Sequence, residues 1–204
     1  MMYLSKLTLR PDRFSRDLTA NPYRIHQIVA GACSNDPRTL FRIEMSGPAP
    51  TILVQSHAYP DWNTSFTSRD LFCLHSTDIR PLHLDFKAGS SYFFRLLANP
   101  TKQNKEIGRR AILGEDSQKE WLGWKLGEAG AQVEEAQVIA CWDQRSYRGY
   151  PKRDSEHMNH HVVLFEGVLQ VTDPDLFAKA VEAGFGRAKG LGCGLLSVAP
   201  MERP

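Results

Sequence analysis

Residues 160–200, HHVVLFEGVLQVTDPDLFAKAVEAGFGRAKGLGCGLLSVAP, carry the clearest signals of the fold. The apolar run predicts a strand over 160–171, in which Gly167 marks a bend. Asp173 and Pro174 are residue types preferred at the cap and at the first position of a helix, and Gly184 is preferred just after a helix end. With a last strand over 192–200, the stretch predicts the order strand, helix, strand.

The residues before this stretch extend the same pattern. SYFFRLLA, residues 91–98, and AQVIACW, residues 136–142, predict two more strands. Between them, SQKEWLGWKLGEAG, residues 117–130, predicts a helix capped by Ser117, with Glu120 completing a capping box. The second half of the chain is therefore expected to run strand, helix, strand, strand, helix, strand.

The first half has a similar order of elements. MYLSKLTL, residues 2–9, predicts a half-buried strand, and a helix capped by Asn21 follows, with Pro22 at its first position. Strands are expected over 38–45, 51–58 and 82–86. Two such units in tandem predict an α+β protein of two ferredoxin-like (RRM-like) domains, at residues 1–88 and 89–204.

Composition excludes several classes of protein. The chain has 204 residues, 42% hydrophobic and 24% charged, as in an ordinary globular protein. Its net charge of +2 does not by itself favour a nucleic-acid partner, so local clusters must make that case. The four cysteines form no CxxC pair, so we expect buried thiols. With neither an apolar run of about 18 residues nor a signal peptide, we expect a cytoplasmic protein with no membrane partner.

Tyr23 and His26 lie one turn apart at the start of the expected helix and share a face. The first turn of a helix favours an anion such as phosphate. Histidine transfers protons near neutral pH, and tyrosine can orient a hydroxyl. The pair suits an RNA cleavage in which a 2'-hydroxyl attacks the adjacent phosphate, although two half-buried packing residues would give the same spacing.

The glycine-rich segment GFGRAKGLGCG, residues 184–194, is a second candidate site. Its glycines allow close approach of a ligand to the backbone, and two cations lie among them. A dinucleotide fingerprint is not expected, because here a helix precedes the glycines and a strand follows them. The segment therefore predicts contact with a polyanion or, alternatively, a tight turn; its candidate residues are Gly184, Gly186, Arg187, Lys189 and Gly190.

Basic residues cluster in two further segments, KQNKEIGRR and RSYRGYPKR, each expected to be a loop. Arg13 and Arg16 lie in a charged loop after the first strand. Such clusters suit contact with RNA phosphates, and a solvated loop is the alternative for each. The candidates in the two segments are Lys102, Lys105, Arg109, Arg110, Arg145, Arg148, Lys152 and Arg153.

The histidines of HMNHH raise the possibility of a metal site. On a strand, His160 and His161 point to opposite faces and cannot easily bind one ion. We therefore expect neither a metal nor a cofactor.

The segments MYLSKLTL, NPYRIHQ, YFFRLLANPTK, VLFEGVLQVTDP and GFGRAKGLGCGLLSVAP resemble, in this order, signature segments of the CasE-type CRISPR-associated endoribonucleases of the repeat-associated RNA-binding superfamily. The resemblance implies metal-independent cleavage of precursor CRISPR RNA at the base of the repeat hairpin, leaving a 2',3'-cyclic phosphate. It also implies that the protein stays bound to the hairpin of the mature guide RNA within the Cascade complex.

By the same resemblance, His26 matches the catalytic histidine of the family and Tyr23 its companion. Positions where some members carry lysines near the scissile phosphate correspond here to Gly31 and to the region of Glu156 and His157. A third catalytic group therefore stays open among Lys152, Arg153 and the histidines of HMNHH. A non-catalytic RNA-binding scaffold is the alternative function.

Overall fold

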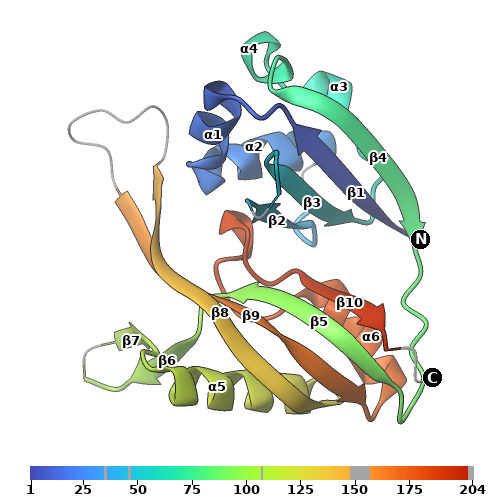
Figure 1. The fold of residues 1–204 in the computed structure, drawn as a ribbon, viewed down its shortest axis with the longest axis vertical. Coiled ribbons are helices and arrows are strands. Elements are labelled where there is room, and N and C mark those ends of the chain that lie inside the picture. The colour runs from blue at the N-terminus through green and yellow to red at the C-terminus, as the bar shows by residue number, and fades with distance from the viewer. Residues whose placement is uncertain (35, 46, 107, 148–156, 202–204) are drawn as a thin grey trace. The chain divides into compact units, whose positions relative to one another are not determined.

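The computed structural model describes residues 1–34, 36–45, 47–106, 108–147 and 157–201, and its chain forms two compact units (Figure 1). Unit 1 comprises Met1–His83, Arg145–Asn159 and Lys189–Gly192. Unit 2 comprises Leu84–Gln144, His160–Ala188 and Cys193–Pro204. The division into two continuous domains, 1–88 and 89–204, stays a prediction. The units themselves are discontinuous, because two short segments of the second half pack in unit 1.

Unit 1 is an antiparallel sheet with its strands in the order β2-β3-β1-β4. Its core forms where the apolar face of α2, including Ile25, Ile28 and Val29, joins Leu7 and Ile52 of the sheet. The elements are β1 (Met2–Leu9), α1 (Arg13–Thr19), α2 (Pro22–Ala32), β2 (Leu40–Glu44), β3 (Thr51–Ser56), α3 (Trp62–Ser65), α4 (Ser68–Leu71) and β4 (Leu74–Leu82).

Two predictions for unit 1 were wrong. The charged segment with Arg13 and Arg16 is a helix, α1, because the carboxylate of Asp12 accepts a hydrogen bond from the backbone N–H of Ser15 at 2.8 Å and caps its first turn. The last strand covers Leu74–Leu82 and not 82–86. Its side chains are mostly exposed, so it lacks an apolar pattern, whereas Leu84 and Phe86 pack on the core of unit 2.

Unit 2 has a second antiparallel sheet, in the order β10-β5-β9-β8. Leu122 and Leu126 of α5 and Phe177 of α6 pack with Leu96 and Phe165 of the sheet in its core. The elements are β5 (Ser91–Ala98), β6 (Thr101–Asn104), β7 (Gly108–Ala111), α5 (Glu115–Glu128), β8 (Ala131–Tyr147), β9 (His157–Val171), α6 (Pro174–Ala183) and β10 (Leu196–Pro200); the short 3-10 helix η1 (Lys189–Leu191) belongs to unit 1.

Glycine and capping residues fix several of these elements. Gly167 is required in β9, because a Cβ there would lie 2.0 Å from the carbonyl oxygen of Glu135 on β8. Helix α6 begins and ends as predicted, with the Asp173 side chain accepting from the backbone N–H of Leu176. The prediction of a Ser117 cap was wrong, since α5 begins two residues earlier, after Gly114, whose φ of +89° favours glycine.

The two sheets share one topology. When the strands of each unit are numbered in chain order, both sheets have the order 4-1-3-2, with helices in the two crossover connections. This arrangement confirms the predicted α+β fold of two ferredoxin-like domains. Three cysteines are buried as expected, but Cys141 is exposed. Within the described residues, no helix has the length and apolar character needed to span a membrane.

Candidate functional site

Tyr23 and His26 lie near the start of α2 in unit 1, both half-buried. Their ring centroids are 6.1 Å apart, and the ring planes are inclined by 44°. Ile25, Ile28 and Val29 of the same helix are buried in the core. The predicted arrangement is therefore present, with the core residues on one side of the helix and the Tyr23/His26 pair at its edge.

The glycine-rich segment reaches His26. Its residues Lys189–Gly192 belong to unit 1, and a Cβ built on Gly190 would lie 3.5 Å from Cε1 and 3.6 Å from Nδ1 of the His26 imidazole. The backbone of η1 therefore packs against the ring, with Lys189 next in the chain. Two motifs that the sequence indicated separately thus meet at one place, through residues His26 and Gly190 that are 164 positions apart.

Burial sets the protonation states at this place. It lowers the pKa of His26 below the ordinary 6.5 and the pKa of Lys189 below the ordinary 10.5. At neutral pH the imidazole is therefore largely uncharged and ready to accept a proton. Among the described residues, no carboxylate forms an ion pair with His26.

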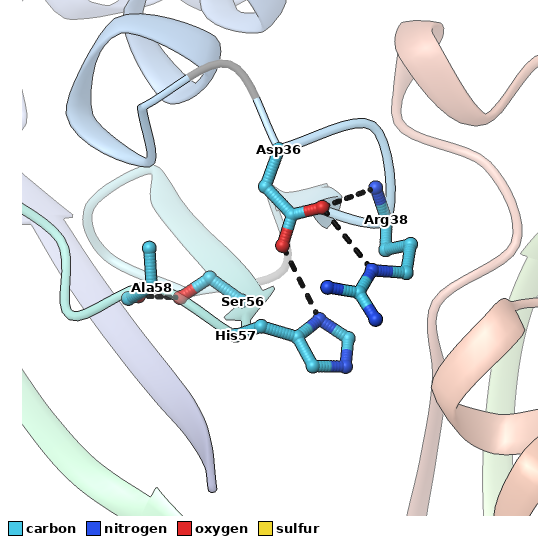
Figure 2. Close-up of polar contacts among 5 residues, drawn as sticks. All are labelled: Asp36, Arg38, Ser56, His57 and Ala58. Atoms are coloured by element: carbon cyan, nitrogen blue, oxygen red, sulfur yellow. Dashed lines mark hydrogen bonds and ion pairs between the residues drawn. The ribbon is translucent and has the colours of Figure 1, made fainter.

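Another histidine of unit 1 does have a carboxylate partner. Figure 2 shows Asp36 between His57 and Arg38, with one carboxylate oxygen 3.4 Å from Nδ1 of His57 and the other accepting hydrogen bonds from Arg38. The backbone N–H of Arg38 is the main reason that the pKa of Asp36 is lowered. This cluster connects the turn before β2 to the end of β3. The contact between His57 and Asp36 is therefore explained by a structural role and does not indicate a catalytic site.

Asn21 has a role that its sequence position did not reveal. It precedes α2 but makes no capping hydrogen bond. Its amide nitrogen instead donates to the carbonyl oxygen of Tyr147, and its amide oxygen accepts from the backbone N–H of Tyr147, both at 3.2 Å. The end of β8, with exposed Arg145, is thereby fastened to the start of the Tyr23/His26 helix within unit 1.

A second anchor of α2 was also missed. Arg24, between Tyr23 and His26, forms a close ion pair with the buried carboxylate of Asp70, which also accepts a hydrogen bond from Thr67 at 2.6 Å. Of the predicted cations in unit 1, Arg13 pairs with Asp17 at 3.8 Å on the solvent side of α1, and Arg16 is exposed there. Arg148, Lys152 and Arg153 lie outside the described residues.

The basic segment KQNKEIGRR forms a two-stranded hairpin, β6–β7, in place of the predicted loop (Figure 1). Lys102 lies directly opposite Arg110, an arrangement of like charges that destabilises a hairpin. Lys105 and Arg109 are exposed as well. None of these four cations has an ion-pair partner in the described part of the chain, so the hairpin favours an anionic partner.

A pocket of about 700 Å3 lies in unit 2, between this hairpin and α5. Lys102, Arg109, Gly186 and Arg187 all contribute to its lining. Gly186, with φ +75°, lets the backbone approach Trp121, since a Cβ there would lie 3.2 Å from the indole ring. The pocket therefore joins the basic hairpin with the first part of the glycine-rich segment, where Gly184 ends α6.

His160 and His161 of HMNHH have different surroundings. His161 Nδ1 lies 3.0 Å from the carboxylate of Asp143, and its Nε2 is 3.4 Å from the amide nitrogen of buried Gln118. Burial lowers the pKa of His160 on the same strand. No group of three potential metal ligands occurs among the residues that the structure describes.

Comparisons with known proteins agree over nearly the whole chain. A family model described as CRISPR associated protein matches residues 2–200. The CRISPR-associated endoribonuclease Cse3 of Thermus thermophilus is 34% identical, with 98% of this chain and 100% of the relative covered. The Cascade subunit CasE of Escherichia coli is 31% identical at the same coverage.

A solved structure matches at the level of the fold as well. Thermus thermophilus Cse3 bound to an RNA representing a pre-cleavage complex has a TM-score of 0.84 and 33% identity, covering 98% of this chain and 99% of the other. Family model, full-length relatives and fold thus agree with the resemblance found in the sequence. The chain belongs to the family of CRISPR-associated proteins that includes Cse3 and CasE.

Proposed function

We propose that this protein is an endoribonuclease that cleaves precursor CRISPR RNA at the base of the repeat hairpin and stays bound to the mature guide RNA. A full-length relative is named as an endoribonuclease, and its structure has been solved with RNA in a pre-cleavage complex. Another relative is named as a Cascade subunit, which supports other Cascade subunits as partners. We expect the protein to act in the cytoplasm.

The proposed reaction is transesterification at the scissile phosphate. The neutral imidazole of His26 takes the proton of the 2'-hydroxyl, and the 2'-oxygen attacks phosphorus. The bond from phosphorus to the 5'-oxygen breaks, and this oxygen takes up a proton from water, while the imidazolium of His26 returns its proton to the solvent. The products are a 2',3'-cyclic phosphate and a 5'-hydroxyl, and the step requires proton transfer and charge stabilisation but no metal ion.

The observation that carries the proposal is the position of His26. Its ring is half-buried between the first turn of α2 and the backbone of Gly190, and burial keeps its pKa low. Tyr23, on the same edge of the helix, would orient the 2'-hydroxyl. Lys189, next to Gly190, and Arg145, at the end of β8, would stabilise the charge on the phosphate.

The RNA hairpin would be held by cations in both units. In unit 2 these are Lys102, Lys105, Arg109 and Arg110 of the β6–β7 hairpin, together with Arg187 and the backbone of Gly184 and Gly186. In unit 1, Arg13 and Arg16 of α1 would add phosphate contacts. Arg148, Lys152 and Arg153, which lie outside the described residues, remain candidates for the same role. Because A-form RNA is recognised largely through its shape and backbone, such contacts need little reading of bases.

The test is cleavage of a labelled RNA with the sequence of the host's own CRISPR repeat, in buffer with EDTA. The His26→Ala protein should cleave about 10²- to 10⁴-fold more slowly than wild type, while binding the RNA with similar affinity. His75→Ala is the matched control, because His75 is an exposed histidine of another element, β4. The 5' product should end in a 2',3'-cyclic phosphate that resists phosphatase, and the 3' product should begin with a 5'-hydroxyl.

Cleavage by His26→Ala at the wild-type rate would refute the assignment of His26. A strict requirement for added divalent metal would refute the mechanism. Binding without cleavage by the wild-type protein would favour the non-catalytic scaffold.

A further inference from the structure

Helix α5 carries an exposed tryptophan beside the basic hairpin. Trp121 and Trp124 both line the pocket of unit 2, but Trp121 is only 6% exposed and Trp124 is 57% exposed. Trp121 stacks on Phe165 in the core, with ring centroids 6.4 Å apart. The core therefore accounts for the first indole but not for the second.

The Trp124 ring is nevertheless held in place by charged neighbours. The ammonium group of Lys125 lies 3.9 Å from the centroid of the ring, a distance typical of a cation–π contact. Lys125 itself is fixed by an ion pair of 2.9 Å with Glu128 on the same helix. The indole is thus oriented at the surface, and its place in the lining of the pocket sets it apart from single exposed side chains elsewhere.

The charges around the indole define the class of this partner. Lys102, Arg109 and Arg187 also line the pocket, and Glu120 is its one acidic residue among those described. None of the three cations has an ion-pair partner within the described part of the chain. A pocket of about 700 Å3 with an aromatic ring and unpaired cations fits a ligand that has both a flat ring and negative charge.

We propose that this pocket binds one unpaired nucleotide of the repeat RNA, with the base stacked on Trp124 and the adjoining phosphates contacted by Lys102, Arg109 and Arg187. A base-paired stem needs only cations, because the faces of its bases are already covered by their neighbours. An exposed indole gains most from a base that is out of the stack. The inference rests on the proposed function and adds a base contact to it.

The test combines protein variants with abasic substitutions in the labelled repeat RNA. Trp124→Ala should weaken binding by about five- to 150-fold, the range for loss of one stacked base, and Trp124→Phe should retain most of the affinity. At one unpaired position, an abasic nucleotide should weaken binding to wild type by a similar factor and should cause no further loss with Trp124→Ala.

Two measurements exclude a merely structural effect of the substitution. The salt dependence of binding should be the same for Trp124→Ala and wild type, because every cation that faces a phosphate is still present. Trp142→Ala is the matched control, since Trp142 is 41% exposed on β8 outside the pocket lining and should bind as wild type does. RNA should also quench less of the tryptophan fluorescence in Trp124→Phe than in Trp142→Phe.

The failures of the two proposals can be told apart. If wild type binds and cleaves the repeat RNA while Trp124→Ala binds equally well, the pocket does not stack a base and only this inference is overturned. Losses that simply add for Trp124→Ala and every abasic position would overturn it too. If wild type does not bind the RNA, both this inference and the proposed function are wrong.

Discussion

The two units place different chemistry at the same point of the same topology. In each, an additional element lies between the first strand and a longer helix, which is α2 in unit 1 and α5 in unit 2. This additional element is α1 in unit 1 and the β6–β7 hairpin in unit 2. In unit 1 the helix that follows presents a half-buried histidine of lowered pKa, whereas in unit 2 it presents an exposed tryptophan among solvated cations. The same fold can thus carry a reacting group, whose pKa is lowered by burial, and a binding surface, whose side chains are exposed to a partner.

The largest effect should come from neutralising the binding surface of unit 2. Replacing Lys102, Arg109 and Arg110 together by alanine should weaken binding of the repeat RNA by about tenfold for each cation that contacts a phosphate. The slope of log affinity against log salt should become shallower by about 0.7–0.9 for each phosphate that the variant no longer neutralises. Both quantities can be measured by fluorescence anisotropy at several salt concentrations.

The cleavage step itself should not change in this triple variant. At saturating protein, its single-turnover rate should match that of wild type, because the reacting groups belong to unit 1. Lys179→Ala, which removes an exposed cation on α6 outside the pocket lining, controls for the loss of a positive charge elsewhere on the surface. A cleavage rate that falls with the affinity would contradict the division of roles between the units.

A smaller effect is expected at Asn21 in unit 1, where a substitution should change the cleavage rate and not the RNA affinity. Asn21→Ala removes both hydrogen bonds to the backbone of Tyr147, so α2 loses its link to the end of β8. Two hydrogen bonds of about 1 kcal/mol each are lost, and we expect part of this free energy to raise the barrier of the cleavage step. The cleavage rate at saturating protein should therefore fall about tenfold, while the RNA affinity should change little.

Asn21→Ser separates this link from helix capping. Serine caps a helix well but is too short to replace both bonds to Tyr147. The variant should unfold at nearly the same temperature as wild type and still cleave slowly. Restoration of the wild-type cleavage rate by serine would show that Asn21 serves only as a cap.

Elements with local signals could be predicted from the sequence. Helix α6 begins after Asp173, at Pro174, and ends before Gly184, as expected. The apolar spacing of α2 placed Tyr23 and His26 at its edge. The glycine-rich segment was also found, because five glycines in eleven residues are unusual for a turn. In each case the residues that carry the signal lie within one element.

Features that depend on tertiary contacts could not be predicted. The pairing of Asn21 with Tyr147 joins residues 126 positions apart, and Asn21 looks like an ordinary cap in the sequence. The β6–β7 hairpin has polar residues on both faces, so it shows no apolar alternation. The exposed tryptophan of α5 had a signal in the sequence. Trp121 and Trp124 are three residues apart, so they lie on neighbouring parts of the helix surface. The structure buries only Trp121.

The smallest predicted effect compares a histidine of each unit. Burial lowers the folded-state pKa of His26 in unit 1 and of His160 in unit 2 below the ordinary 6.5. As the pH falls through 6.5, the unfolded chain binds protons that the folded chain does not, so the free energy of unfolding decreases until the folded pKa is passed. Above pH 6.5 neither group makes stability depend on pH. Both His26→Gln and His160→Gln should reduce the loss of stability on acidification, measured by urea unfolding at pH 7.5 and 5.5.

Only one of the two titrations should also control catalysis. If His26 accepts the proton of the 2'-hydroxyl, kcat/KM on the acidic side should fall with a midpoint below 6.5, since this ratio reports groups of the free enzyme. His160→Gln should leave this midpoint unchanged although it alters the pH dependence of stability. A shift of the kinetic midpoint in His160→Gln would contradict this assignment. A substitution in unit 2 would then change the titration of a reaction that we assign to unit 1.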